Sequence, residues 1–532
     1  MLEERIDLKV DRNILDPFFD GYKYSVESPS FDSTRIPGNV SIVSRGSDMF
    51  SLQHMKMFGD VNYLTIDEFS SNDETQFLYT FANNHIVEIL YQNATDSNNF
   101  TNVAEYPLGA QGAYPPSIIF VQNNFAIVCN GLDDITVFLT KTDRNEWINY
   151  TSFQPCPEPG ISMVDAKFID DRLHVLCKRI FDEAEKGTKK PEYLTQLIWT
   201  VLAPSAIGEF AVEKTTNVYQ RGLFETGSIT NNGSIITIAT KKPSFSLEEK
   251  SEDIDSHVFS KSWTQTGRKI EISITLPADV TRTSVNLKLT AKSVFLTIGD
   301  HILMEGSFDN SIDPEDYSYD VADRLLSITL TAADDTKWTK LLEADVVGSD
   351  KKSILGDVAS DIIGETAEEC DESEPVLSIY WLNESSVVRQ CDASGHQVLF
   401  TRRDGHQSSV CLRHDVDGLI WSLKDPAPVH TNTLNAFGYV QSSKTHRLWS
   451  GCSPDRSYAC IVDSNHIFVY WQSVAVAGDL VNRKSSSRVT HIAKQQVLKL
   501  DSSESIVGVV PTNKKMFILT TDRIHVAKMS KP

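Results

Sequence analysis

The chain has 532 residues, enough for two or three domains, and its 40% hydrophobic and 23% charged residues are ordinary for a globular protein. Its 72 acidic residues outnumber the 50 basic ones, and the resulting net charge of −22 repels phosphate backbones, which argues against direct nucleic-acid binding. No apolar run approaches the ~20 residues of a membrane helix, and the first residues lack a signal-peptide pattern, so we expect a cytoplasmic and nuclear protein without membrane contact. The eight cysteines form no C-x-x-C pair, and we expect them to be reduced thiols.

A short strand, a tight polar turn and a second strand recur through residues 1–250. Four copies begin in this part of the chain, with strands at 77–81 and 86–90, 125–129 and 135–139, 173–177, and 235–239. Phe77, Phe125 and Leu173 stand 48 residues apart. A repeat near fifty residues with paired short strands is typical of β-propeller blades, which bury their faces only when stacked around an axis.

Residues 257–345 form a different kind of segment. Ile270, Ile272 and Ile274 alternate with polar residues, which predicts a strand with one buried and one exposed face. Similar patterns follow at 285–289, 294–298, 301–304 and 326–330, and Trp338 with Leu341 and Leu342 closes the segment. Short strands at this spacing predict an independent antiparallel sandwich.

Four strings and a later tryptophan in this segment resemble the CS domain of the NudC family of co-chaperones. They are SWTQT (262–266), EISITLP (271–277), LMEGSF (303–308), LLSITL (325–330) and the later Trp338. The chain departs from the family at Tyr317–Tyr319, where a Trp is usual, and at Thr331, where a Lys is usual, so contacts made by those two groups are not carried over. We expect Trp263, Gln265, Lys288 and Lys292 to bind a partner, although Trp263 could be a packing residue and the lysines a solvated face.

Acidic segments flank the predicted sandwich. Residues 248–255 carry mostly polar and acidic side chains, and residues 346–375 form a longer acidic linker in which 354–363 could make a short helix. We expect both segments to act as tethers.

The hairpin unit returns in residues 376–532. Three copies are predicted, at 410–414 with 419–421, 458–462 with 466–470, and 517–520 with 523–526. Seven hairpins in two groups predict an all-β fold: one discontinuous β-propeller of about seven blades with an inserted antiparallel β-sandwich, closed by the two terminal segments. Two separate sandwiches flanking the module are the alternative.

Further strings outside the module also resemble a member of the NudC family that has a CS domain inserted in a propeller. They are ILDPFFDGYKYS (14–25), CLRHDVDGLIW (411–421), FGYVQSSK (437–444) and AKQQV (493–497). The resemblance implies a monomeric, non-enzymatic co-chaperone or adaptor. Its implied partners are the ninety-kilodalton heat-shock chaperone, β-propeller clients and a DEAH-box RNA helicase.

Local signals for catalysis or metal binding are weak. Cys391, His396, His406, Cys411 and His414 cluster along the chain, but Cys411 and His414 are three apart in a strand and should point to opposite faces. Asp415–Gly418 reads as a hairpin turn in which Gly418 supplies a positive φ. The basic loop 483–488 could dock an acidic partner or be a solvated loop. We expect no catalytic residue, cofactor or metal; a hydrolase with its site at the propeller axis is the alternative function.

Overall fold

The computed structural model describes residues 4–16, 19–27, 29–47, 49, 51–59, 61–107, 114–140, 146–182, 193–205, 209–247, 261–275, 285–298, 301–322, 325–338, 340–342, 377–444, 447–475, 481, 489, 491–501 and 505–530. The chain divides into two compact units, one of Met1–Glu248 with Asp371–Pro532 and one of Glu249–Cys370. Both acidic segments, the helix expected at 354–363 and the basic loop 483–488 lie outside the described residues. In the described part, no helix is long and apolar enough to span a bilayer.

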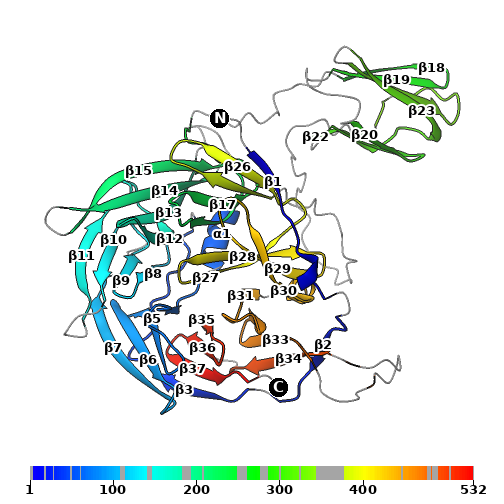
Figure 1. Cartoon of the computed structure of the whole chain (residues 1–532). Coiled ribbons are helices and arrows are strands. Elements are labelled where there is room, and N and C mark those ends of the chain that lie inside the picture. The colour runs from blue at the N-terminus through cyan, green and yellow to red at the C-terminus, as the bar shows by residue number, and fades with distance from the viewer. Residues whose placement is uncertain are drawn as a thin grey trace. The chain divides into compact units, whose positions relative to one another are not determined.

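The first unit is a β-propeller, and its described residues form seven blades (Figure 1). The first three blades are made of consecutive strands: β4 (Thr65–Ile66), β5 (Thr75–Ala82), β6 (His85–Gln92) and β7 (Ser97–Glu105); β8 (Ser117–Gln122), β9 (Phe125–Cys129), β10 (Ile135–Leu139) and β11 (Ile148–Phe153); β12 (Ser162–Ile169), β13 (Arg172–Asp182), β14 (Tyr193–Pro204) and β15 (Phe210–Gln220). Every predicted strand in this part falls inside one of the two middle strands of a blade.

The last three blades follow the inserted module. They contain β27 (Val398–Asp404), β28 (Gln407–His414), β29 (Asp417–Ser422) and β30 (Val429–Leu434); β31 (Arg447–Cys452), β32 (Tyr458–Asp463), β33 (His466–Ala475) and β34 (His491–Lys499); β35 (Ile506–Pro511), β36 (Lys515–Thr520) and β37 (Arg523–Lys528). The three predicted hairpins are again the middle pairs, because those strands are buried on both faces and carry the clearest apolar runs.

The fourth blade is built from both sides of the insertion. Its order is β16 (Phe224–Ile229), β17 (Ile235–Ala239), β25 (Ser378–Leu382) and β26 (Val387–Asp392). Strands β17 and β25 pair antiparallel, with Ile235 opposite Leu382 and Ala239 opposite Ser378. The module therefore replaces the turn of the middle hairpin. The prediction of one discontinuous propeller is confirmed, and the alternative of two separate sandwiches is wrong.

The N-terminal segment closes the ring. Strand β3 (Phe31–Arg35) pairs antiparallel with β37 and completes the seventh blade, with Phe31 opposite Ala527. Strands β1 (Glu4–Asp7) and β2 (Tyr22–Tyr24), separated by the 3-10 turn η1 (Arg12–Ile14), add parallel fifth strands to β26 and β34.

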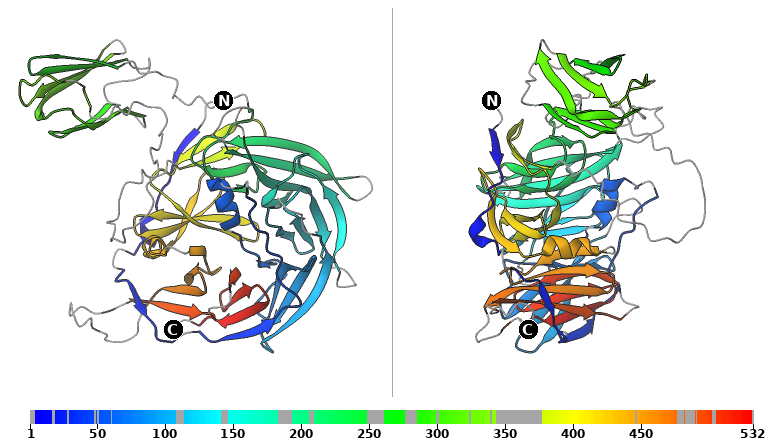
Figure 2. Two further views of the ribbon diagram at one scale, coloured as in Figure 1. Left: turned by 180° about the vertical axis from the view of Figure 1, so that it is seen from behind. Right: turned by 90° about the vertical axis from the view of Figure 1, so that its right-hand side faces the viewer.

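Apolar packing shows that the ring is complete. A separate buried cluster lies at each junction between consecutive blades, including the junction between the last blade and the first. At that closing junction Phe517 and Val526 of the seventh blade pack with Leu78 and Ile89 of the first. Figure 2 shows the ring from behind and from the side.

The strand order gives the ring two distinct faces. The first, which we call the α1 face, carries the connections between blades and the turns between the second and third strands of each blade. Helices α1 (Leu52–Gly59) and α2 (Phe437–Ser442) lie in connections between blades and therefore belong to this face. His54 and Met57 of α1 are buried against Tyr114, Ile180 and neighbouring side chains. The opposite face, which we call the turn face, carries the remaining turns of each blade.

The residues with positive φ in the hairpin turns agree with the expected tight turn at 83–84 and differ from the prediction at 415–418. Asn83 and Asn84 both have positive φ, 50° and 62°, as a tight hairpin turn requires. The prediction that Gly418 supplies a positive φ is wrong, because Asp415 does so with φ 53°. Gly418 lies in β29, where a Cβ would come within 2.9 Å of Cys411 Sγ, so close packing is what requires a glycine there.

The second unit is a sandwich of two sheets. One is ordered β18 (Lys261–Thr266), β19 (Lys269–Thr275), β24 (Leu325–Ala332) and β23 (Ile312–Ala322), and the other β20 (Val285–Leu289), β21 (Ser293–Ile298) and β22 (His301–Ser307). Its core lies entirely within the module and includes the predicted alternating residues together with Trp338, Leu341 and Leu342. Strands β18 and β23 were not predicted, since both are rich in polar residues.

We expect deletion of residues 1–35 to open the ring, because it removes the strand that covers the edge of β37. The thermal unfolding midpoint should fall by at least about 10 °C. Deletion of residues 1–8 is the matched control: it removes only β1 from a blade that already has four strands, so it should have a much smaller effect. Equal midpoints for the two deletions, measured by circular dichroism, would contradict this account of closure.

Candidate functional site

The four predicted partner-binding residues lie on different sheets of the inserted module. Trp263 and Gln265 belong to β18, at the edge of the four-stranded sheet, whereas Lys288 belongs to β20 and Lys292 to the turn that follows it. Both lysines are exposed. Trp263 is half-buried and packs against the module core opposite Ile272, as the packing interpretation anticipated.

Gln265 uses its side-chain amide within the module. Its Nε2 donates to the carbonyl oxygens of Gly267 and Thr336 at 2.9 and 3.0 Å, and its Oε1 accepts from the backbone N–H of Trp338 at 2.8 Å. Gln265 therefore fastens β18 to the segment that carries the buried Trp338. Its role in partner binding stays a prediction, as do those of Trp263, Lys288 and Lys292.

Tyr317 and Thr331 stand where the module departs from the family pattern. The side chain of Tyr317 is 42% exposed on β23, and Thr331 is half-buried on β24. Tyr319, two residues further along β23, packs against the core instead.

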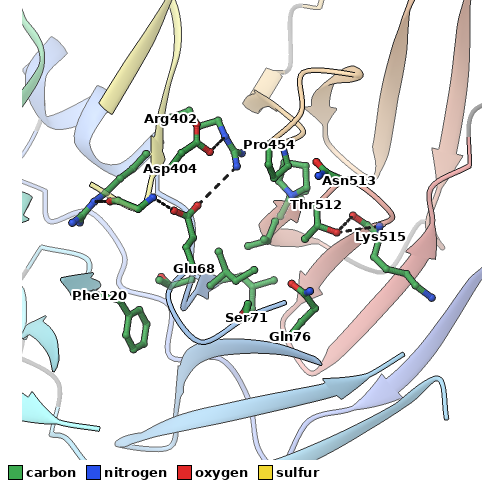
Figure 3. A pocket seen from close by; sticks show the side chains of 18 of the residues that line it. Glu68, Ser71, Gln76, Phe120, Arg402, Asp404, Pro454, Thr512, Asn513 and Lys515 are labelled. Atoms are coloured by element: carbon green, nitrogen blue, oxygen red, sulfur yellow. Dashed lines mark hydrogen bonds and ion pairs between the residues drawn. The ribbon is translucent and has the colours of Figure 1, made fainter. Parts of the chain in front are cut away.

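The propeller axis holds a cavity of about 610 Å³ (Figure 3). Its walls come from the innermost strands β4, β8, β27, β31 and β35, and its rim from turns on the turn face. The half-buried apolar side chains in its lining include Ile66, Phe69, Ile119 and Trp449.

A charged network lies in the wall of this cavity. Arg402 Nε is 2.6 Å from Asp404 Oδ1, and Arg456 forms an ion pair with the other oxygen of the same carboxylate. Glu68 Oε2 accepts the backbone N–H of Gly405, while Glu68 Oε1 stays 3.9 Å from Arg402 Nη2. Burial raises the pKa of Glu68, and the Gly405 N–H and Arg402 oppose that shift only in part.

A second polar network joins three neighbouring blades. Asp165 on β12 is buried and accepts hydrogen bonds from Ser228 Oγ and the Ile229 N–H at 3.0 and 2.8 Å. Arg403 on β27 lies 3.6 Å from Asp165 and donates to the carbonyl of Ala166. These contacts hold the inner strands together.

The carboxylates at the axis are thus tied to guanidinium or backbone groups. A hydrolase at the axis would be expected to present carboxylates free to move protons or hold a metal. Within the described ranges, no group of three or more His, Cys, Asp or Glu side chains is placed to hold a metal ion.

The histidines and cysteines that cluster in the sequence do not meet at one site in the fold. Cys391 and Cys411 are buried between blades. His396 stacks on the exposed His414 with ring centroids 5.4 Å apart on the α1 face, whereas His406 lies beside Phe69 at 4.9 Å. As predicted, Cys411 and His414 point away from each other.

Sequence reasoning missed the axial residues. Glu68 and Gly405 are 337 positions apart, and only ring closure brings their blades together. The hydrophobic pattern that reveals strands says nothing about such pairs, so no local signal could have found this cavity.

Comparison with known proteins supports the resemblance inferred from the strings. The CS domain family model matches residues 260–331. NudC domain-containing protein 1 of Xenopus laevis is 24% identical over 580 residues, and that of Mus musculus is 25% identical over 582; each match covers 98% of this chain and 98% of the relative. The WD40 domain of SCAP from fission yeast aligns over 96% of this chain and 98% of its own, at 9% identity and a TM-score of 0.27.

The resemblance to the NudC family is therefore confirmed along almost the whole chain, and the inserted module matches a CS domain. Together these findings support a co-chaperone-like, protein-binding role.

Replacing Gln265 with Glu should destabilise the module by about 1–3 kcal/mol, because two donors facing carbonyl oxygens are lost. Urea unfolding of the fragment 257–345, which contains the whole core cluster, measures the change. Lys288→Gln, at an exposed position, is the control and should leave the midpoint where it is. An unchanged midpoint for Gln265→Glu would show that the three hydrogen bonds are not a stabilising clamp.

Glu68 should make the stability of the propeller depend on pH. A carboxyl group whose pKa is higher in the folded chain than in the unfolded chain lowers the free energy of unfolding once it ionises. Its contribution to stability is therefore most favourable below its pKa in the unfolded chain, and it declines as the pH rises through its pKa in the folded chain. We expect the melting temperature of Glu68→Gln, minus that of the native chain, to increase between about pH 4 and pH 7. A difference that stays flat or decreases over this range would contradict the prediction.

Proposed function

We propose that this protein is a non-enzymatic co-chaperone or adaptor that binds protein partners through both its CS domain and its propeller. The observation that carries the proposal is the insertion of a CS domain between two paired strands of a closed ring. Because Ala239 and Ser378 are register partners, the ring retains the blade while the chain leaves and returns. Two separately folded binding elements on one chain are what an adaptor requires.

The partners follow from the resemblance to the NudC family. We propose that the CS domain contacts the ninety-kilodalton heat-shock chaperone or a β-propeller client, and that a DEAH-box RNA helicase is a further partner in the cytoplasm and nucleus. The exposed Lys288 and Lys292 would meet an acidic surface, and Trp263 would be reached only at its uncovered part. Such a monomer would need no cofactor.

The hydrolase alternative receives less support. Its site would have to lie at the axis, where Asp404 is shared by Arg402 and Arg456 and where Asp165 is buried under backbone and hydroxyl donors. Groups held in this way suit a structural role.

Affinity purification with mass spectrometry tests the proposal. The full chain should retain a chaperone and a helicase, a chain lacking residues 257–345 should lose the partners that need the CS domain, and Lys288→Glu with Lys292→Glu should lose them selectively. The matched control is Lys269→Glu with Lys340→Glu, which changes the charge by the same amount elsewhere on the module. Retention of the same proteins by every variant would refute a role for the CS domain.

A further inference from the structure

The axial cavity is bounded by edge strands. Strands β4, β8, β27, β31 and β35 each stand at the end of their sheet, and the cavity lies among them. An edge strand presents backbone N–H and C=O groups that its own sheet does not use. Extended peptides are the ligands that match such edges, because they offer donors and acceptors in alternation.

One donor and one acceptor in the cavity wall form an ion pair but no hydrogen bond. The distance of 3.9 Å between Glu68 Oε1 and Arg402 Nη2 exceeds that of a hydrogen bond. The other polar atoms of both side chains are engaged: Glu68 Oε2 with Gly405, Arg402 Nε with Asp404, and Arg402 Nη1 with the carbonyl of Cys452 at 2.8 Å. The side-chain amide of Asn or Gln carries an N–H donor on the same side as its C=O acceptor, so it could bridge this gap, whereas the N–H and C=O of a trans backbone amide point in opposite directions.

Charge at the cavity favours a neutral group over an ion. Arg402 and Arg456 are balanced by Asp404 and Glu68. Two further cations of the lining are also paired, Arg403 with Asp165 and Lys514 with Asp73. A charged ligand would leave an uncompensated charge in a partly buried site, which is costly.

The remaining walls and the size suit a short peptide. Apolar side chains line the rim and walls, among them Ile66, Phe69, Ile119, Trp449 and Pro454. A volume of about 610 Å³ is within the range of natural ligand pockets. Apolar walls beside strand edges would accept the alternate side chains of an extended segment.

We propose that this cavity binds a short extended segment of a partner protein, with the uncharged side-chain amide of an Asn or Gln of that segment held between Glu68 and Arg402. The inference rests on the proposed adaptor role and deepens it, since it gives the propeller a binding site of its own on the turn face.

A random heptapeptide library displayed on phage and selected against the immobilised full-length chain tests the proposal. Enriched peptides, labelled with a fluorophore, should bind the native chain in an anisotropy titration. Thr401→Trp should weaken binding at least tenfold, because Thr401 is an exposed residue of the lining and indole would fill the cavity. Glu68→Gln, whose amide oxygen can still accept from the Gly405 N–H, should weaken it several-fold, because its amide nitrogen then takes the place of the ligand-facing oxygen and donates instead of accepting.

Val416→Trp is the matched control, because Val416 is an exposed turn residue on the α1 face, and it should leave the affinity unchanged. Failure to enrich any peptide would overturn the proposal, as would peptides that bind Thr401→Trp as tightly as the native chain. Enrichment only of peptides whose binding needs a Lys, Arg, Asp or Glu side chain would overturn the neutral-amide assignment. Partners retained through the CS domain should be the same for full-length Thr401→Trp, so failure of the cavity and failure of the adaptor role are distinguishable.

Discussion

The pairing of β17 with β25 is the interaction on which the rest of the structure depends. The two inner strands of the fourth blade precede the insertion and the two outer strands follow it, so neither part of the chain can complete the ring alone. The cost of holding the two strands together across a long insertion is modest, because each doubling of a loop adds only about 0.6 kcal/mol of closure entropy. Burial of Ile236, Ile238, Ile379 and Trp381 between blades readily exceeds such a cost.

The N-terminal segment supplies the outermost strands of three blades. β3 supplies the outermost strand of the blade that the C-terminal strands begin, and β1 and β2 cover the outer edges of two other blades. Arg389 of β26 reinforces the first of these additions by reaching Glu4 at 2.7 Å. Strands β1 and β2 are only four and three residues long, and edge strands this short offer little backbone for a strand of another molecule to pair with.

How much could be predicted from the sequence depended on whether a feature was local. The middle hairpins were found because their strands are apolar on both faces and their turns contain residues such as Asn83 and Asn84. Outer strands such as β15 are largely exposed and polar, so they carry no comparable pattern. The partner of β17, the parallel strands and the contact between Glu68 and Gly405 all depend on ring closure, and a local pattern cannot show which distant segments meet.

The strand order also separates the axial cavity from the two points where the chain leaves and re-enters the propeller. Ala239 and Ser378, at which the chain leaves and re-enters the fourth blade, lie at the end of their strands toward the α1 face. The axial cavity is rimmed by turns of the opposite face, among them the segment that follows β4 and the one that follows β35. A peptide in the cavity would therefore touch neither end of the insertion.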